Sequence, residues 1–106
     1  MRAHHQHFRG GELNHGVFRD HNGAMSTDWT KYSDAAQSRA RARVPADNAI
    51  ISLPVLGVRA AGQVVRHDPI AGPPDGPNRA HTNGIGVKTT EVRFKLHELT
   101  IIEIAL

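Results

Sequence analysis

The chain contains no cysteine and no long hydrophobic run. The absence of cysteine excludes disulfide bonds, thiolate metal ligands and a cysteine nucleophile. No apolar stretch approaches the roughly 20 residues that a membrane-spanning helix needs. The first residues are polar and rich in histidine, with no apolar signal region. These absences lead us to expect a soluble, cytoplasmic protein with no membrane partner.

Aromatic residues are also scarce, at 5% of the chain, while hydrophobic residues of all kinds make up 39%. Leucine, isoleucine and valine must therefore supply most of the core, and they lie mostly after residue 49. A chain of 106 residues fits one domain. We expect a single small α+β domain over residues 1–106, with a few-stranded sheet mostly from the second half and about two helices. Residues 1–11 are a candidate flexible N-terminal segment.

Positive charge exceeds negative charge by a small margin. Lysine and arginine number 13 against 10 aspartate and glutamate, a formal net charge of +3. The pI is nevertheless near 10.0, because arginine far outnumbers lysine and hardly titrates. This charge permits contact with phosphate groups or acidic partners without requiring it. His4, His5 and His7 lie close together, but no metal-site spacing accompanies them, so we expect no metal and no cofactor.

Four segments carry the clearest structural signals. Residues 33–44 predict a helix that Ser33 caps and a following proline stops. Residues 49–55 form an apolar run typical of a strand. Residues 89–99 fit helical and strand spacing alike, and a threonine followed by a glutamate at the start favours the helix. Residues 100–106 are β-branched and apolar, which predicts a terminal strand.

A loop rich in proline and glycine gathers polar side chains in the second half of the chain. A strand-like run delivers His67 and Asp68 to the loop, which returns through Asn78 and Arg79 to His81. If Arg79 and His81 lie on one strand, their side chains point the same way. His67 and Asp68 are neighbours, so a regular strand would turn them to opposite faces. We expect a polar pocket at this loop, with a rigid connector as the alternative.

Two positions outside the loop add candidate binding residues. Arg19 is a candidate pocket residue, although such an arginine is often simply paired with a surface carboxylate. Trp29 is the only tryptophan and lies close to Lys31 and Tyr32. It can serve as a stacking platform for a nucleic-acid base, or it can close the edge of a small core.

Three classes of function fit these residues. The leading hypothesis is a small basic accessory protein that binds a phosphate-bearing ligand or RNA. The first alternative is a metal-independent ribonuclease or other small hydrolytic enzyme, in which His67 and His81 act as general base and general acid. The second is a structural subunit that docks on a protein partner or on another copy, which an exposed apolar edge strand would favour. The candidate ligand-binding residues are Arg19, Trp29, Asp68, Asn78 and Arg79.

The run VVRHDPI, followed by NRAHTNGIGVK, resembles a family of small bacterial proteins of uncharacterised function. The FRD run and the segment Ser26-Thr27-Asp28 upstream extend the resemblance over most of the chain. It implies no activity, so no residue takes a role from it.

Overall fold

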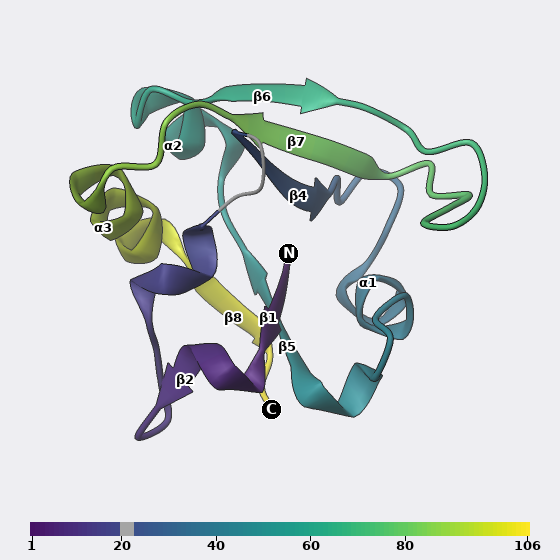
Figure 1. Cartoon of the computed structure of the whole chain (residues 1–106), viewed down its shortest axis with the longest axis horizontal. Helices are drawn as coiled ribbons and strands as arrows, with labels where there is room; N and C mark the ends of the chain where they lie inside the picture. Colours follow the sequence, from purple (N-terminus) through teal and green to yellow (C-terminus); the bar gives the residue numbers. More distant parts are fainter. Residues whose placement is uncertain (20–22) are drawn as a thin grey trace.

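A computed structural model of the chain describes residues 1–19 and 23–106 and has an α+β fold (Figure 1). The strands are β1 (Arg2–His4), β2 (Phe8–Arg9), β3 (Glu12–Leu13), β4 (Ala24–Asp28), β5 (Asn48–Ser52), β6 (Val64–His67), β7 (His81–Ile85) and β8 (Ile101–Ile104). The helices are α1 (Ala35–Ala40), α2 (Val55–Ala60) and α3 (Thr90–Leu99), with short 3-10 turns η1 (His5–His7), η2 (His15–Phe18) and η3 (Pro45–Asp47). Asp20, at the end of the FRD run, lies outside the described residues.

The described strands form two antiparallel three-stranded sheets and a separate two-stranded hairpin, β2-β3. One sheet has the order β1-β5-β8 and the other the order β4-β7-β6. The sequence analysis expected a single sheet, and it treated residues 1–11 as a candidate flexible segment. In the structure Arg2, Ala3 and His4 instead pair with β5, so the beginning of the chain is a sheet strand.

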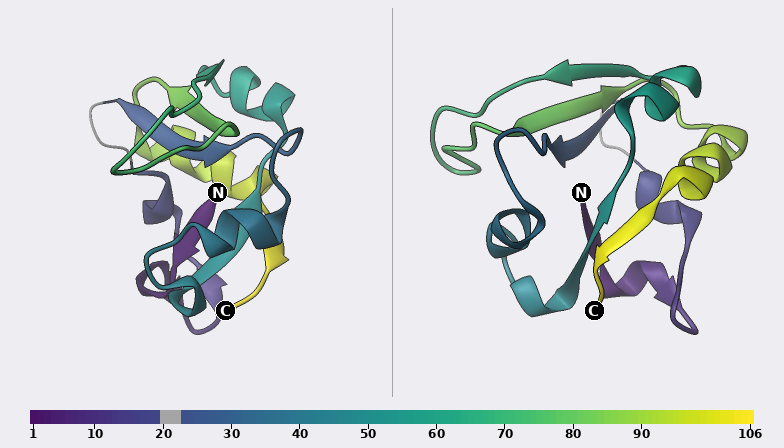
Figure 2. Two further views of the ribbon diagram at one scale, coloured as in Figure 1. Left: turned by 90° about the vertical axis from the view of Figure 1, so that its right-hand side faces the viewer. Right: turned by 180° about the vertical axis from the view of Figure 1, so that it is seen from behind.

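The core lies where β5, η2 and α3 meet. Phe18, Ile51 and Leu96 are the largest fully buried side chains. The same buried cluster includes Met25 of β4 and Val58 of α2, so it joins the two sheets. Figure 1 and the right-hand view of Figure 2 show α1 and α3 on opposite sides of the molecule, with β5 running between them.

Helix α1 is shorter than the helix predicted for residues 33–44. Its N-cap is Asp34 rather than Ser33, and Asp34 and Gln37 form a reciprocal capping box. The helix ends at Ala40, and the chain then turns through η3 into β5. The Arg39 Nε–H donates to the carbonyl oxygens of the η3–β5 segment at 3.0 and 2.9 Å, which satisfies backbone acceptors in that turn.

Strands β6 and β7 form a ribbon that carries the proline-rich loop at its end (Figures 1 and 2). His67 pairs with Thr82, and His81 pairs with Asp28 across β4 and β7. Paired residues share a sheet face, while successive residues alternate. Thr82 and Met25 are buried on the core face, and the opposite face is more polar. No helix in the described part of the chain is long and apolar enough to cross a membrane.

Candidate functional site

The two histidines of the proline-rich hairpin do not converge. His67 pairs with Thr82 and therefore shares a sheet face with it. His81 is the neighbour of Thr82 on β7, so its side chain points to the opposite face. His67 lines one cavity and His81 lines another. The ring of His67 is held by its own contact, a 2.8 Å hydrogen bond in which Nε2–H donates to the Arg79 carbonyl oxygen. An acid–base pair acting on one substrate across this hairpin is therefore not favoured by the geometry.

His67 belongs instead to an aromatic cluster with Trp29 and Tyr32. The His67 ring centroid lies 5.1 Å from that of Trp29 in an edge arrangement and 5.5 Å from that of Tyr32 in a stacked one. Trp29 and Tyr32 meet edge to face at 5.3 Å. The Trp29 side of the cluster is open to solvent, since 37% of this residue remains exposed. This exposure favours the interpretation of Trp29 as part of an open aromatic surface over its interpretation as a residue that closes the core.

Local backbone contacts fix the position of the aromatic cluster. Trp29 follows directly after β4, and its N–H donates to the Ala80 carbonyl oxygen at 2.8 Å, which extends the pairing beyond the strand end. The Tyr32 N–H then donates to the Trp29 carbonyl oxygen at 3.0 Å and closes a turn. This turn folds Tyr32 back beside Trp29. His67 is the last residue of β6, and its side chain lies on the same sheet face as Thr82.

Two cations lie over the aromatic cluster. The Arg79 guanidinium is 4.0 Å from the Tyr32 ring centroid, and Lys31 Nζ is 5.2 Å from the Trp29 ring centroid and 5.4 Å from that of Tyr32. Hydrogen bonding to Arg79, followed by the charge of Lys31, lowers the pKa of Tyr32 from its ordinary value of 10.0. Neither Lys31 nor Arg79 forms an ion pair with a carboxylate of the described residues. Their charges therefore remain available to an anion.

A cavity of about 590 Å³ opens beside the aromatic cluster. Its walls come from the core face of the β4-β7-β6 sheet and from β5 and α2, and they are mainly apolar. Trp29 and His67 line it together with Arg59. An apolar cavity with a few polar groups at its border is the usual form of a small-ligand site.

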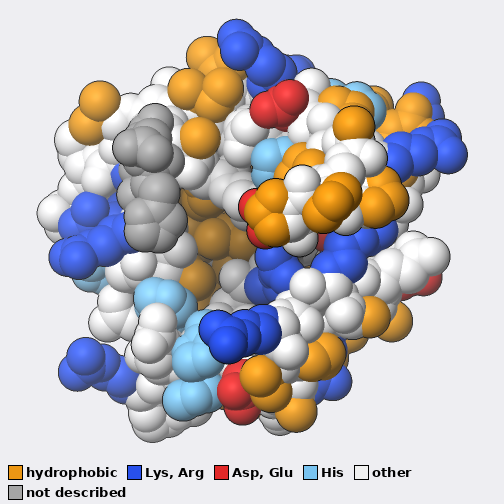
Figure 3. Space-filling view, turned by 45° about the vertical axis from the view of Figure 1, so that its right-hand side comes forward, with side chains coloured by type: hydrophobic (Ala, Val, Ile, Leu, Met, Phe, Trp, Pro, Cys, Tyr) orange, Lys and Arg blue, Asp and Glu red, His pale blue; other side chains and the backbone are white. Residues whose placement is uncertain are grey.

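A second cavity, of about 780 Å³, lies beneath the proline-rich loop, and Met1, Thr27 and Asp28 line both cavities. We call it the arginine pocket, because Arg2, Arg41 and Arg43 line it. Figure 3, in which the right-hand side of Figure 1 comes forward, shows a hollow bordered by blue lysine or arginine and pale-blue histidine side chains. Arg2 and Arg43 form no ion pair with the described carboxylates, so two of the three guanidiniums are uncompensated.

His81 lies in the arginine pocket and is hydrogen-bonded through both ring nitrogens. A carbonyl oxygen can only accept, so Nδ1 donates its proton to the Asp68 carbonyl oxygen at 2.8 Å. Nε2 of the neutral ring then accepts from the Ser26 hydroxyl at 2.9 Å. The arrangement holds the serine hydroxyl against an imidazole acceptor, and it leaves no ring nitrogen of His81 for His67 or for a ligand in this state.

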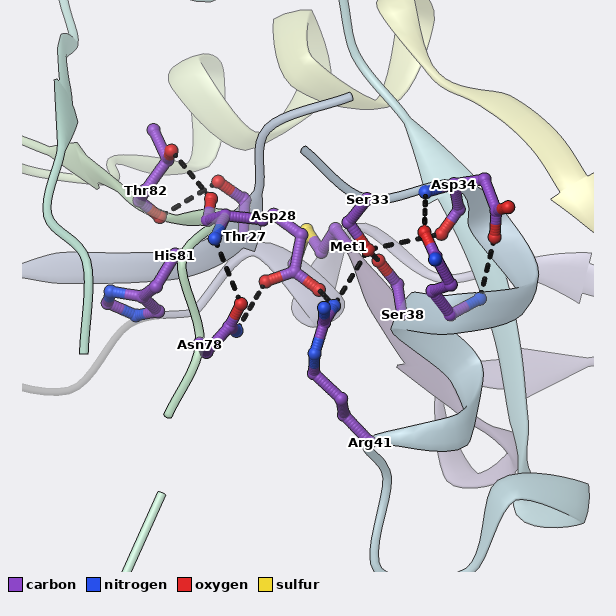
Figure 4. A network of polar contacts seen from close by, with 12 residues as sticks. Met1, Thr27, Asp28, Ser33, Asp34, Ser38, Arg41, Asn78, His81 and Thr82 are labelled. Atoms are coloured by element: carbon purple, nitrogen blue, oxygen red, sulfur yellow. Dashed lines mark hydrogen bonds and ion pairs between the residues drawn. The ribbon is translucent and has the colours of Figure 1, made fainter. Parts of the chain in front are cut away.

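Asp28 connects the arginine pocket to α1 (Figure 4). Its carboxylate accepts from Asn78 Nδ2 at 2.9 Å and from Arg41 Nη1 at 3.0 Å. Arg41 also donates to the Ser33 hydroxyl at 2.7 Å, and that hydroxyl contacts Ser38 at 2.8 Å. Burial alone would raise the pKa of Asp28, but the hydrogen bond from Asn78, the neighbouring Ser38 hydroxyl and the charge of Arg41 lower it below its ordinary 3.8.

The remaining predicted site residues have other surroundings. Asn78 is 8% exposed, and both its amide nitrogen and its amide oxygen are bonded, the oxygen accepting from the Ala80 N–H at 3.1 Å. The Asp68 carboxylate accepts from Asn83 Nδ2 at 3.0 Å. Arg19 caps the end of η2 and lines neither cavity. The structure therefore brings together Trp29, His67 and Arg79, and leaves Arg19 apart from them.

The sequence analysis missed the arginine pocket. In the predicted helix over residues 33–44, the alternate arginines at 39, 41 and 43 would not share one face. Because α1 ends at Ala40, Arg41 and Arg43 lie beyond the helix and line the same cavity. The signal was the alternation itself, interpreted with the wrong helix end.

Comparison with family models, with curated proteins and with solved structures finds no match for this chain, so its function is inferred from geometry alone.

Proposed function

We propose that this protein binds a phosphate-bearing ligand, and specifically single-stranded RNA, at the aromatic cluster of Trp29, Tyr32 and His67. The observation that carries the proposal is the convergence of these three rings, with centroids 5.1 to 5.5 Å apart, under two cations, Lys31 and Arg79, that form no ion pair with the described carboxylates.

Base stacking and phosphate contact require the residue types that meet here. Aromatic rings stack on bases of any sequence, because every base has a π face, and each such contact contributes about 1–3 kcal/mol. Lysine and arginine beside the rings supply the sequence-independent attraction to the phosphate backbone. The adjacent apolar cavity offers room for an unstacked base, while the exposed Lys31 and Arg79 remain toward solvent.

Binding is favoured over acid–base chemistry at the hairpin. A ribonuclease with two catalytic histidines needs both imidazoles near one phosphodiester. His67 and His81 are on opposite faces of the β4-β7-β6 sheet, and both donate ring protons to backbone carbonyl oxygens. The proposed role of His67 is therefore stacking.

The fluorescence of Trp29 provides a direct test, since it is the only tryptophan. Titration with a short single-stranded oligoribonucleotide is expected to quench this fluorescence, and the same RNA with a dye should show increased anisotropy. Trp29→Ala is expected to weaken the affinity measured by anisotropy about 5- to 150-fold, which corresponds to about 1–3 kcal/mol for a lost stack. Circular dichroism of the variant checks that the fold is intact.

A matched pair of arginine variants separates a specific site from general charge. Arg79→Ala is expected to weaken binding and to reduce the dependence of log affinity on log salt by about one. Arg66→Ala removes the same charge from an exposed position next to His67, on the opposite face, and should bind nearly as the wild type does. Equal losses in both variants, or an unchanged affinity of Trp29→Ala, would contradict the proposal. If a mononucleotide displaces the labelled RNA and inorganic phosphate does not, one nucleotide is enough to fill the site.

A further inference from the structure

The N-terminal histidines meet an aspartate from a distant part of the chain. His4, His5 and Asp47 each offer one ligand atom, and these three atoms all lie within 4.8 Å of one another. His4 and Asp47 are half-buried, and His5 is exposed. The rings of His4 and His5 are 4.2 Å apart between centroids.

The fold, rather than local sequence, creates this cluster. His4 is the last residue of β1 and pairs with Asn48, the first residue of β5. Asp47 directly precedes Asn48 at the end of η3, and His5 directly follows His4 at the start of η1. The antiparallel ladder therefore holds the ends of two segments more than 40 residues apart side by side, so the three side chains are positioned before any ligand arrives.

We propose that His4, His5 and Asp47 form a binding site for a divalent transition-metal ion of the zinc class. Two imidazoles and one carboxylate are the donor set that zinc accepts in sites with an open position, whereas magnesium and calcium prefer oxygen ligands. At zinc–ligand distances of about 2.0–2.2 Å, tetrahedral geometry places two ligand atoms about 3.3–3.6 Å apart, so the three atoms must approach one another by about 1 Å. Small side-chain rotations therefore bring the three atoms within reach.

Metal binding would break few existing contacts of the three ligand side chains. The His4 ring accepts a hydrogen bond from the Gln6 N–H at 3.3 Å, which is long and correspondingly weak. Asp47 forms no ion pair with a cation of the described residues, so its carboxylate is not already neutralised. The three ligands leave at least one position for water or for an anionic ligand.

Isothermal titration of the purified, chelator-treated chain with Zn²⁺ alone tests the site. We expect one ion per chain and a rise in the melting temperature with Zn²⁺ concentration, because a ligand of the folded state stabilises it by mass action. Mg²⁺ should produce neither effect. His4→Ala and Asp47→Asn should each weaken Zn²⁺ binding at least about tenfold, since even outer-shell changes at metal sites cost that much.

Gln6→Ala is the matched control, because Gln6 lies on η1 between His5 and His7 and is not one of the three ligands. It should bind Zn²⁺ as the wild type does. Circular dichroism without metal checks whether each variant is folded. If His4→Ala does not fold, the nearly isosteric Asp47→Asn still tests the site. Absence of stoichiometric binding, or wild-type affinity in the folded Asp47→Asn variant, would overturn the assignment. Neither result bears on RNA binding at the aromatic cluster, which involves different residues.

Discussion

At the scale of single residues, Asp28 links separate parts of the chain at the arginine pocket. It ends β4, and its carboxylate joins the proline-rich loop through Asn78 and the segment after α1 through Arg41. Only 15% of its side chain is exposed, so these contacts replace water that the carboxylate has lost. Its ion pair therefore differs from the exposed pair Lys95–Glu91, which contributes little to stability.

Replacing Asp28 by asparagine should destabilise the fold in a pH-dependent manner. The variant loses a charged acceptor for Asn78 and Arg41, and we expect a loss of about 1–3 kcal/mol near neutral pH. Because the pKa of Asp28 is lowered in the folded state, its contribution is complete above its ordinary value of 3.8 and disappears as pH falls through the lower folded value. Urea denaturation at about pH 6 and about pH 3 measures the free energy of unfolding of both proteins. The difference in this free energy between wild type and Asp28→Asn should be smaller at the lower pH. A difference that is constant across this range would contradict the role of the ionised carboxylate.

At the scale of elements, the sequence was informative where local signals decide the structure. The apolar runs that became β5 and β8 were recognisable because β-branched residues fit a pleated surface. The helix over residues 89–99 was also predicted, and its cap is Thr89, one residue earlier than expected. These signals depend on neighbours in the chain, so one sequence is enough to detect them.

The partners of these elements could not be predicted in the same way. Pairing of β1 with β5 depends on chain reversals whose geometry no local pattern encodes. The faces taken by His67 and His81 follow from the register of β6 on β7, and a slip of one residue would reverse them. The composition of the aromatic cluster was partly predictable, since Trp29, Lys31 and Tyr32 are close in sequence. Its union with His67 and Arg79 required the tertiary fold.

The capping box of α1 provides a test at this scale. Asp34 accepts from the Gln37 N–H at 2.7 Å, while the Gln37 side chain accepts from the Asp34 N–H at 2.9 Å. A helix of six residues has few internal hydrogen bonds, so its N-terminal cap matters. Asp34→Ala should lower the free energy of unfolding by about 1 kcal/mol, as measured by urea denaturation. Asp34→Asn keeps a side-chain acceptor of similar capping strength and should remain close to wild type. A full loss in Asp34→Asn would attribute the effect to charge instead of capping.

At the scale of the whole molecule, the two sheets are joined by one small core. Met25 of β4, Ile51 of β5 and Leu96 of α3 belong to the same buried cluster. A domain of this size retains only about 5–15 kcal/mol of net stability, so one lost core side chain removes a large share of it. The β4-β7-β6 sheet, which carries the aromatic cluster, therefore depends on a core that α3 helps to form, and α3 lies beside the left-hand ends of β6 and β7 in Figure 1.

Leu96→Ala should reveal this dependence. Leu96 is fully buried, and deleting such a side chain typically costs about 2–5 kcal/mol through lost burial and the remaining cavity. Trp29 fluorescence reports on the β4-β7-β6 sheet, and far-ultraviolet circular dichroism reports on the whole chain, so both urea midpoints should fall together in a cooperative domain. Leu56→Ala makes the same chemical change at a side chain that is 80% exposed and should alter neither midpoint appreciably. If Leu96→Ala lowered the circular dichroism midpoint and left the Trp29 transition in place, the two sheets would be independent folding units, and the aromatic cluster would not rely on the shared core.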